Sequence, residues 1–140
     1  MESTIVKTEY GRVEGFYDDG LFKWFGIPYA EPPVEELRFK RAKKCRPWEE
    51  IRTCRQMAPA PIQMTGGRFA EFTGTDRPES EDCLYLNIWS FEGARNAPVM
   101  IYIYGGAHHG GDAGAPEYDL SAFARDGIVG VSFNYRLGVL

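Results

Sequence analysis

The sequence predicts an α/β fold, and the second half of the chain carries the prediction. Residues 98–104 (PVMIYIY) are a near-continuous apolar run, typical of a strand buried on both faces of a sheet, and residues 128–135 (IVGVSFNY) are another. Between them lie a glycine-rich loop and a short helix candidate at 120–125, introduced by Asp119. Strand, loop, helix and strand in this order make a βαβ unit, which favours α/β over all-β.

The start of the chain is rich in strand-forming residues. Short runs at 4–9, 12–17 and 21–25 contain Val, Ile, Tyr, Phe and Trp, and turn residues separate them at 10–11 and 18–20. Alternation of such runs with glycine-containing turns predicts an antiparallel β meander.

The middle of the chain is irregular. Residues 26–80 hold seven of the nine prolines and show no clear periodicity, so we expect them to wrap around a larger body. Residues 84–91 (LYLNIWSF) are a further strand candidate.

Composition and charge limit the possible partners. The 140 residues are 44% hydrophobic and 14% aromatic, enough for the core of one compact domain. A net charge of −4 gives no reason to expect nucleic acid or an anionic membrane as partner. The basic run 38–44 has acidic neighbours and is interpreted as a solvated face.

The first residues show neither a basic stretch nor an apolar segment of the kind found in a secretion signal, which predicts a cytoplasmic location. Cys45, Cys54 and Cys83 are odd in number, and their spacing fits neither a disulfide framework nor a zinc site, so we expect free thiols. We expect no metal and no cofactor.

The loop at 104–114 (YGGAHHGGDAG) holds five glycines. Glycine serves where the backbone needs positive φ or comes close to a ligand, and outward N–H groups there can receive an anion or a developing oxyanion. A flexible connector is the alternative, and composition leaves both open. A phosphate loop is less favoured, because neither of its glycine motifs is present.

Five motifs follow one another along the chain: FGIPYAEPP (25–33), LRF (37–39), SEDCLYLNIW (80–89), PVMIYIYGGA (98–107) and FNYRLG (133–138). In order and spacing they resemble the type B carboxylesterases, which include para-nitrobenzyl esterases and cholinesterases. The resemblance runs from about residue 5 to residue 140. It implies the α/β-hydrolase fold, with the meander followed by the first strands of the central sheet.

The resemblance also implies that residues 1–140 are the N-terminal part of one such domain. In the family the nucleophile elbow G-E-S-A-G, the acid and the histidine come later, so all three are expected C-terminal of Leu140. None of the five serines lies in G-x-S-x-G, and residues 130–134 (GVSFN) break the pattern at its last position. We therefore assign no catalytic residue within the chain.

The oxyanion hole is what this segment would supply. In the family two of its amide N–H groups come from positions that match Gly106 and Ala107, and a third follows the nucleophilic serine. Such donors bind the oxygen that becomes negative as an ester carbonyl turns tetrahedral. Only the backbone of Ala107 is required, so its methyl group narrows the site without removing the N–H.

His108 and His109 invite a catalytic interpretation, since histidine is the usual general base. The family's base comes from farther along the chain, and neighbouring residues of an extended chain point to opposite sides, which disfavours a metal site. We expect both histidines at the loop surface or in the lining of a pocket.

The family also pairs the arginine of its LRF motif with the glutamate of SEDC, which matches Arg38 and Glu81. This ion pair would pin the irregular segment to the sheet. The family's disulfide partner for Cys83 is absent near Gln63, so Cys83 is expected unpaired. Residues 66–79 hold Phe69 and Phe72 but lack the tryptophan with which cholinesterases bind choline, which favours uncharged esters.

Three hypotheses for the function stay open. The chain is the N-terminal segment of a serine carboxylesterase that acts on a small-molecule carboxylic ester once a complementary C-terminal polypeptide supplies the catalytic residues. Alternatively it is a non-catalytic cholinesterase-like binding or adhesion protein, or a truncated remnant without function.

Overall fold

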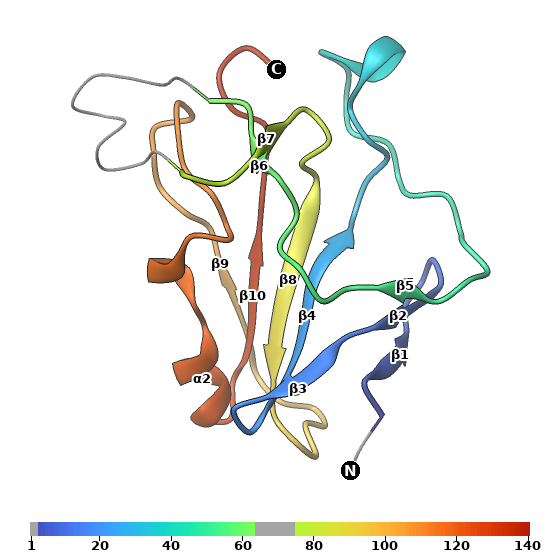
Figure 1. Cartoon of the computed structure of the whole chain (residues 1–140), viewed down its shortest axis with the longest axis vertical. Helices are drawn as coiled ribbons and strands as arrows, with labels where there is room; N and C mark the ends of the chain where they lie inside the picture. The colour runs from blue at the N-terminus through green and yellow to red at the C-terminus, as the bar shows by residue number, and fades with distance from the viewer. Residues whose placement is uncertain (1–2, 64–74) are drawn as a thin grey trace.

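A computed structural model describes residues 3–63 and 75–140, and its centre is a five-stranded mixed sheet (Figure 1). The strands, in spatial order, are β3 (Phe16–Asp18), β4 (Leu21–Pro28), β8 (Tyr85–Ser90), β10 (Val129–Phe133) and β9 (Val99–Tyr102). All neighbours are antiparallel except β9 and β10, which are parallel. The helices η2 (Pro116–Tyr118) and α2 (Ser121–Arg125) connect β9 to β10 along the chain, so the predicted βαβ unit is confirmed.

The expected N-terminal meander divides into two hairpins in different sheets. β1 (Ile5–Lys7) and β2 (Arg12–Glu14) form a small sheet with β5 (Arg52–Thr53), whereas β3 and β4 belong to the central sheet. Gly15 separates the hairpins, and a Cβ atom there would lie 2.2 Å from the carbonyl oxygen of Lys23. Because the chain passes so close to β4, the run 12–17 cannot continue as one strand.

The described parts of the proline-rich middle, residues 29–63 and 75–80, wind around the sheet, as expected (Figure 1). Its regular elements are short: η1 (Glu35–Leu37), β5, β6 (Ala60–Pro61) and β7 (Glu79–Ser80). In the part of the chain that the structure describes, no helix is long and apolar enough to cross a membrane.

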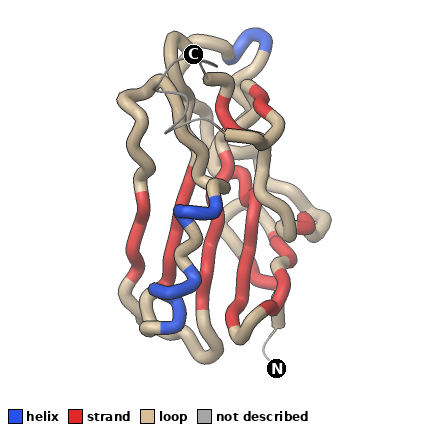
Figure 2. Tube along the Cα trace, turned by 60° about the vertical axis from the view of Figure 1, so that its left-hand side comes forward, coloured by secondary structure: helices blue, strands red, loops and turns tan. Residues whose placement is uncertain are grey.

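The core has two main apolar clusters, one on each face of the central sheet. Alternate residues of β4 divide between them: Phe22 and Trp24 face the small sheet, where they pack with Val13, while Leu21 packs with Leu120 on the side of α2. Figure 2 shows the helical segments η2 and α2 in front of that second face. The sheet is therefore covered on both sides over β4 and β8.

β9 is exposed on one face, contrary to the prediction of a strand buried on both. It lies at the edge of the sheet, and the side chains of Val99, Ile101 and Ile103 are 60%, 60% and 64% exposed. The pairing of Ile101 with Val131 and of Val131 with Ile88 places these aliphatic residues on the face of the small sheet. Within the described residues, that small sheet packs against β4 and β8 and leaves β9 uncovered.

Candidate oxyanion-binding loop and its cleft

The glycine-rich loop leaves the carboxyl end of β9 in a tight turn of left-handed backbone. Gly106, Ala107 and His108 have φ values of 134°, 51° and 61°. A Cβ atom on Gly106 would lie 1.9 Å from the carbonyl oxygen of Gly110, so only glycine fits at that position. The loop is therefore a tight turn in which position 106 requires glycine.

The turn directs the carbonyl group of Gly106 inward. The carbonyl oxygen of Gly106 accepts hydrogen bonds from the N–H of His109 at 2.8 Å and of Gly110 at 3.3 Å. Because a trans peptide is planar, the N–H of Ala107 points opposite to this carbonyl, away from the interior of the turn. Among the described residues, neither Gly106 nor Ala107 has an acceptor for its N–H. Both donors are available to a ligand.

Both ends of the turn are anchored by residues that follow β10. The hydroxyl of Tyr135 donates a hydrogen bond to the carbonyl oxygen of Tyr104 at 2.6 Å. The N–H of Gly138 donates one to the carbonyl oxygen of His108 at 2.7 Å. Farther along, Gln63 holds Gly111 by two bonds: it accepts from the Gly111 N–H at 2.9 Å and donates to the carbonyl at 3.2 Å.

A buried carboxylate fixes the end of the loop. The side chain of Asp112 is 1% exposed. Its Oδ2 lies 2.6 Å from Arg77 Nε in an ion pair and accepts a hydrogen bond from Thr75 Oγ1 at 3.0 Å. It also accepts from the N–H of Gly114 at 2.9 Å. A buried charge with these partners is satisfied, so we assign it a structural role.

Ser132, the serine of the incomplete motif, belongs to the same support. It is fully buried on β10, and its hydroxyl donates to the carbonyl oxygen of Ala113 at 3.1 Å. Asn87 and Asn134 complete this polar cluster, with Asn134 accepting from the N–H of Ala113 at 2.8 Å. A hydroxyl so enclosed has no access to an ester.

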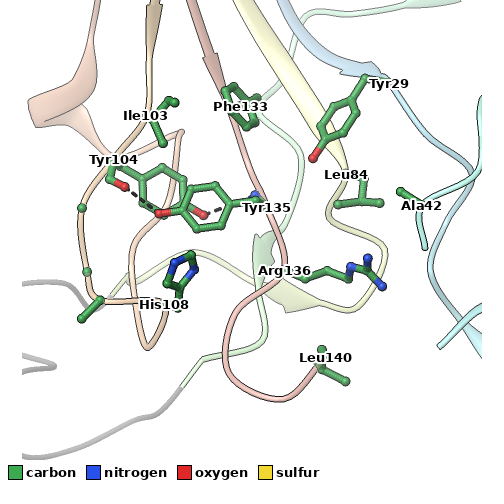
Figure 3. A pocket seen from close by; sticks show the side chains of 13 residues that line it. Tyr29, Ala42, Leu84, Ile103, Tyr104, His108, Phe133, Tyr135, Arg136 and Leu140 are labelled. Carbon is green, nitrogen blue, oxygen red and sulfur yellow. Dashed lines mark hydrogen bonds between the residues drawn. The ribbon is translucent and has the colours of Figure 1, made fainter. Parts of the chain in front are cut away.

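The loop opens onto a cleft of about 680 Å³ (Figure 3). Its walls are mostly apolar or aromatic; Gly106, Ala107, Tyr29, Leu84, Phe133 and Tyr135 are among the lining residues. Burial raises the pKa of the phenols of Tyr29 and Tyr104 above its ordinary value, so both are neutral at physiological pH. The cleft is largely apolar but also holds the guanidinium of Arg136. With two N–H groups that have no acceptor among the described residues, it suits a ligand that carries a carbonyl oxygen.

The two histidines occupy different places. His108 lines the cleft and meets the ring of Tyr135 edge to face, with ring centroids 5.8 Å apart. The N–H of His109 closes the turn. Within the described residues, no group of three or more His, Cys, Asp and Glu side chains is arranged to hold a metal ion.

The other residues that the resemblance singles out lie away from the loop. Arg38 Nε and Glu81 Oε2 are 2.6 Å apart, and the side chains are 39% and 27% exposed. Cys83 is a buried free thiol, and burial raises its pKa to about 11, so it is protonated near neutrality. Phe69 and Phe72 lie outside the described residues.

Sequence reasoning missed the residues that hold the loop. The FNYRLG motif contains Tyr135, but nothing in the motif marks its hydroxyl as the partner of a carbonyl 31 positions earlier. Gln63 lies 48 positions from Gly111, in the segment without periodicity. Only knowledge of the fold brings these segments together.

Comparison with known proteins identifies similar chains. The model of the carboxylesterase family matches residues 2–140. The para-nitrobenzyl esterase of Bacillus subtilis (strain 168) is 38% identical over 143 residues, covering 99% of this chain and 28% of that protein. The fumonisin B1 esterase of Sphingopyxis macrogoltabida is 45% identical over 139 residues, covering 95% and 24%.

Solved structures agree with this assignment. A para-nitrobenzyl esterase structure superposes with a TM-score of 0.87 at 37% identity, covering 98% of this chain and 28% of that one. The fold is accordingly that of the N-terminal part of an α/β hydrolase. The chain spans roughly a quarter of the length of the curated relatives it matches. With a family match over nearly every residue, the chain belongs to the carboxylesterase family.

Proposed function

We propose that this chain forms part of the oxyanion hole of a serine carboxylic ester hydrolase, through the amide N–H groups of Gly106 and Ala107. The nucleophile, acid and base would come from polypeptide C-terminal of Leu140, within the same α/β-hydrolase domain. The substrate would be a small, uncharged carboxylic ester, and we keep the cytoplasm as the expected location.

One observation supports the proposal: Gly106 and Ala107 line a largely apolar cleft at the carboxyl end of β9, and neither N–H has an acceptor among the described residues. When a serine attacks an ester carbonyl, the carbonyl oxygen gains negative charge, and donors aimed at it stabilise the transition state more than the substrate. Collapse of the tetrahedral species releases the alcohol and leaves an acyl-enzyme, which water then hydrolyses.

The test uses a fusion in which this chain, at Leu140, continues into the segment of the Bacillus subtilis esterase that follows the matched stretch. We expect the fusion to hydrolyse para-nitrophenyl acetate with a burst. Replacing Ala107 by lactic acid turns the amide between Gly106 and Ala107 into an ester, which removes the N–H and makes the Gly106 carbonyl a weaker acceptor for His109 and Gly110. We expect kcat to fall by about 100-fold or more, because one oxyanion donor is lost.

The control is the same replacement at Ala122. This residue is exposed in the first turn of α2, where N–H groups have no partner within the helix, so kcat should not change. A full rate in the Ala107 variant would overturn the proposed oxyanion hole. Serine-dependent turnover by the 140 residues alone would overturn the proposed location of the nucleophile.

A folded fusion without esterase activity would instead favour the non-catalytic binding protein.

We also propose that Arg38 and Glu81 act structurally, holding the irregular segment to the rest of the molecule. Their separation of 43 positions along the chain makes the pair a long-range tie.

A further inference from the structure

Tyr104, the last residue before the turn, is held in a column of aromatic rings. Its own side chain is 2% exposed. The ring of Tyr135 stacks on it at 4.5 Å and 14°, and the ring of Tyr118 lies parallel at 6.2 Å and 12°. The position of the Tyr104 side chain is therefore restrained by packing. The direction of the backbone after Tyr104 needs a separate restraint.

The hydroxyl of Tyr135 sets that direction. It donates to the carbonyl oxygen of Tyr104 at 2.6 Å, and Figure 3 shows this bond beside the stacked rings. Because the peptide is planar, the position of this carbonyl fixes the plane of the bond to Gly105. Among the described residues, no other group donates a hydrogen bond to this carbonyl outside the strand pairing.

The two residues that follow cannot set the direction themselves. Gly105 and Gly106 lack a Cβ atom, so each has access to conformations on both sides of φ = 0. A Cβ atom on Gly105 would meet no heavy atom within 4 Å, so packing does not restrain that residue either. An anchor at the preceding carbonyl is what restricts the turn at its start, as Gly138 does at its end.

We propose that Tyr135 is a positioning residue for the amide groups of Gly106 and Ala107. Its ring packs on Tyr104, and its hydroxyl orients the peptide from which the turn begins. The consequence for catalysis rests on the proposed function, whereas the effect on the turn does not.

The first experiment measures the turn directly in the 140-residue chain. Amide resonances of Gly106 and Ala107 are compared by NMR in the unchanged chain, in Tyr135→Phe and in Tyr104→Phe. The matched control, Tyr104→Phe, removes a hydroxyl from the same stacked pair, and with it the long 3.5 Å bond from the Tyr135 N–H, but keeps the 2.6 Å bond to the carbonyl. We expect Tyr135→Phe alone to shift or broaden both resonances. Equal spectra in the two variants would overturn the proposal.

The second experiment uses the fusion described above. We expect Tyr135→Phe to lower kcat between about 10- and 100-fold, because small misplacements of catalytic groups cost that much, and to leave KM within about twofold. Tyr104→Phe should keep kcat within about threefold. 4-Aminophenylalanine at position 135 retains a donor at the same point and should restore most of the rate. Failure of this donor to restore either the rate or the amide resonances would also overturn the proposal.

The two experiments separate the two proposals. An inactive fusion would count against the proposed function, while the resonances of the Gly106 and Ala107 amides would still decide whether Tyr135 orients the turn. If the fusion is active but Tyr135→Phe leaves the amide resonances of the 140-residue chain unchanged, the result would count only against the role proposed for Tyr135.

Discussion

Gly111 shows how tightly single residues restrict the loop. It has a φ of 125°, a region closed to most side chains, and a Cβ atom there would lie 2.3 Å from Cδ2 of Tyr104. The conflict is with a buried ring, which has no free space into which to move. Gly111 thus supports the aromatic column from the side that faces the loop.

We expect Gly111→Ala to lower the free energy of unfolding by about 2–4 kcal/mol, the sum of backbone strain and overpacking. Gly20→Ala is the control, because Gly20 has a φ of 78° but nothing within 4 Å of its Cβ position. Backbone strain alone should cost about 1 kcal/mol there. Urea unfolding measures both, and equal values would contradict the role assigned to the Tyr104 ring.

At this scale the sequence predicted the residues that a motif marks. Gly106 and Ala107 follow a strand within a recognisable motif, and the structure places them at a cleft. Tyr135 and Gln63 act through hydrogen bonds to distant backbone groups. Such bonds leave no periodic or local trace, because the partner is a peptide group that every residue has.

Among the elements, the irregular segment depends most on side-chain ties. Its strands have two residues each, so backbone pairing contributes little, and ion pairs such as that of Arg38 with Glu81 connect it to later parts of the chain. The Arg38 guanidinium has a raised pKa, chiefly because it donates a hydrogen bond to Glu81.

We expect Arg38→Ala to lower the thermal midpoint slightly, since both side chains of the pair are partly exposed to water. Glu81→Ala should have a similar effect. The thermal midpoint of the double variant should be no lower than that of the less stable single variant. Differential scanning calorimetry of the four proteins measures the coupling. Additive losses would show that the two side chains act independently.

The sequence predicted the βαβ unit well, because continuous apolar runs and an intervening helix are local features. It overestimated the burial of β9. An apolar run shows that a strand can be buried on both faces. Whether it is buried depends on how far the other elements extend over the sheet. Within the described part of the chain, the small sheet packs against β4 and β8 but not against β9. The division of the N-terminal run at Gly15 was equally hidden, because it arises from the close approach to Lys23.

At the scale of the whole molecule, β9 is an edge strand of the central sheet and no described strand pairs with its outer side, beside an apolar face. Residues 96–111 contain no Asp, Glu, Lys or Arg, and Val99, Ile101 and Ile103 are more than half exposed. Edge strands without charge or proline are sites of association between chains.

We expect the 140-residue chain to associate increasingly with concentration, and Ile101→Lys to reduce the association by placing a charge on this face. The control is Phe123→Lys, since Phe123 is 42% exposed but lies on α2. Sedimentation velocity over a range of concentrations distinguishes the variants. Equal association of both would exclude β9 as the contact.

The ties on the loop have an energetic consequence for any ligand. Residues from three separate stretches, around 63, around 77 and from 134 to 138, hold the loop before a substrate arrives. The conformational entropy of the glycine-rich turn is therefore lost when the chain folds and not when a ligand binds. The donors are preorganised, so a bound ester should leave the backbone order of the loop nearly unchanged.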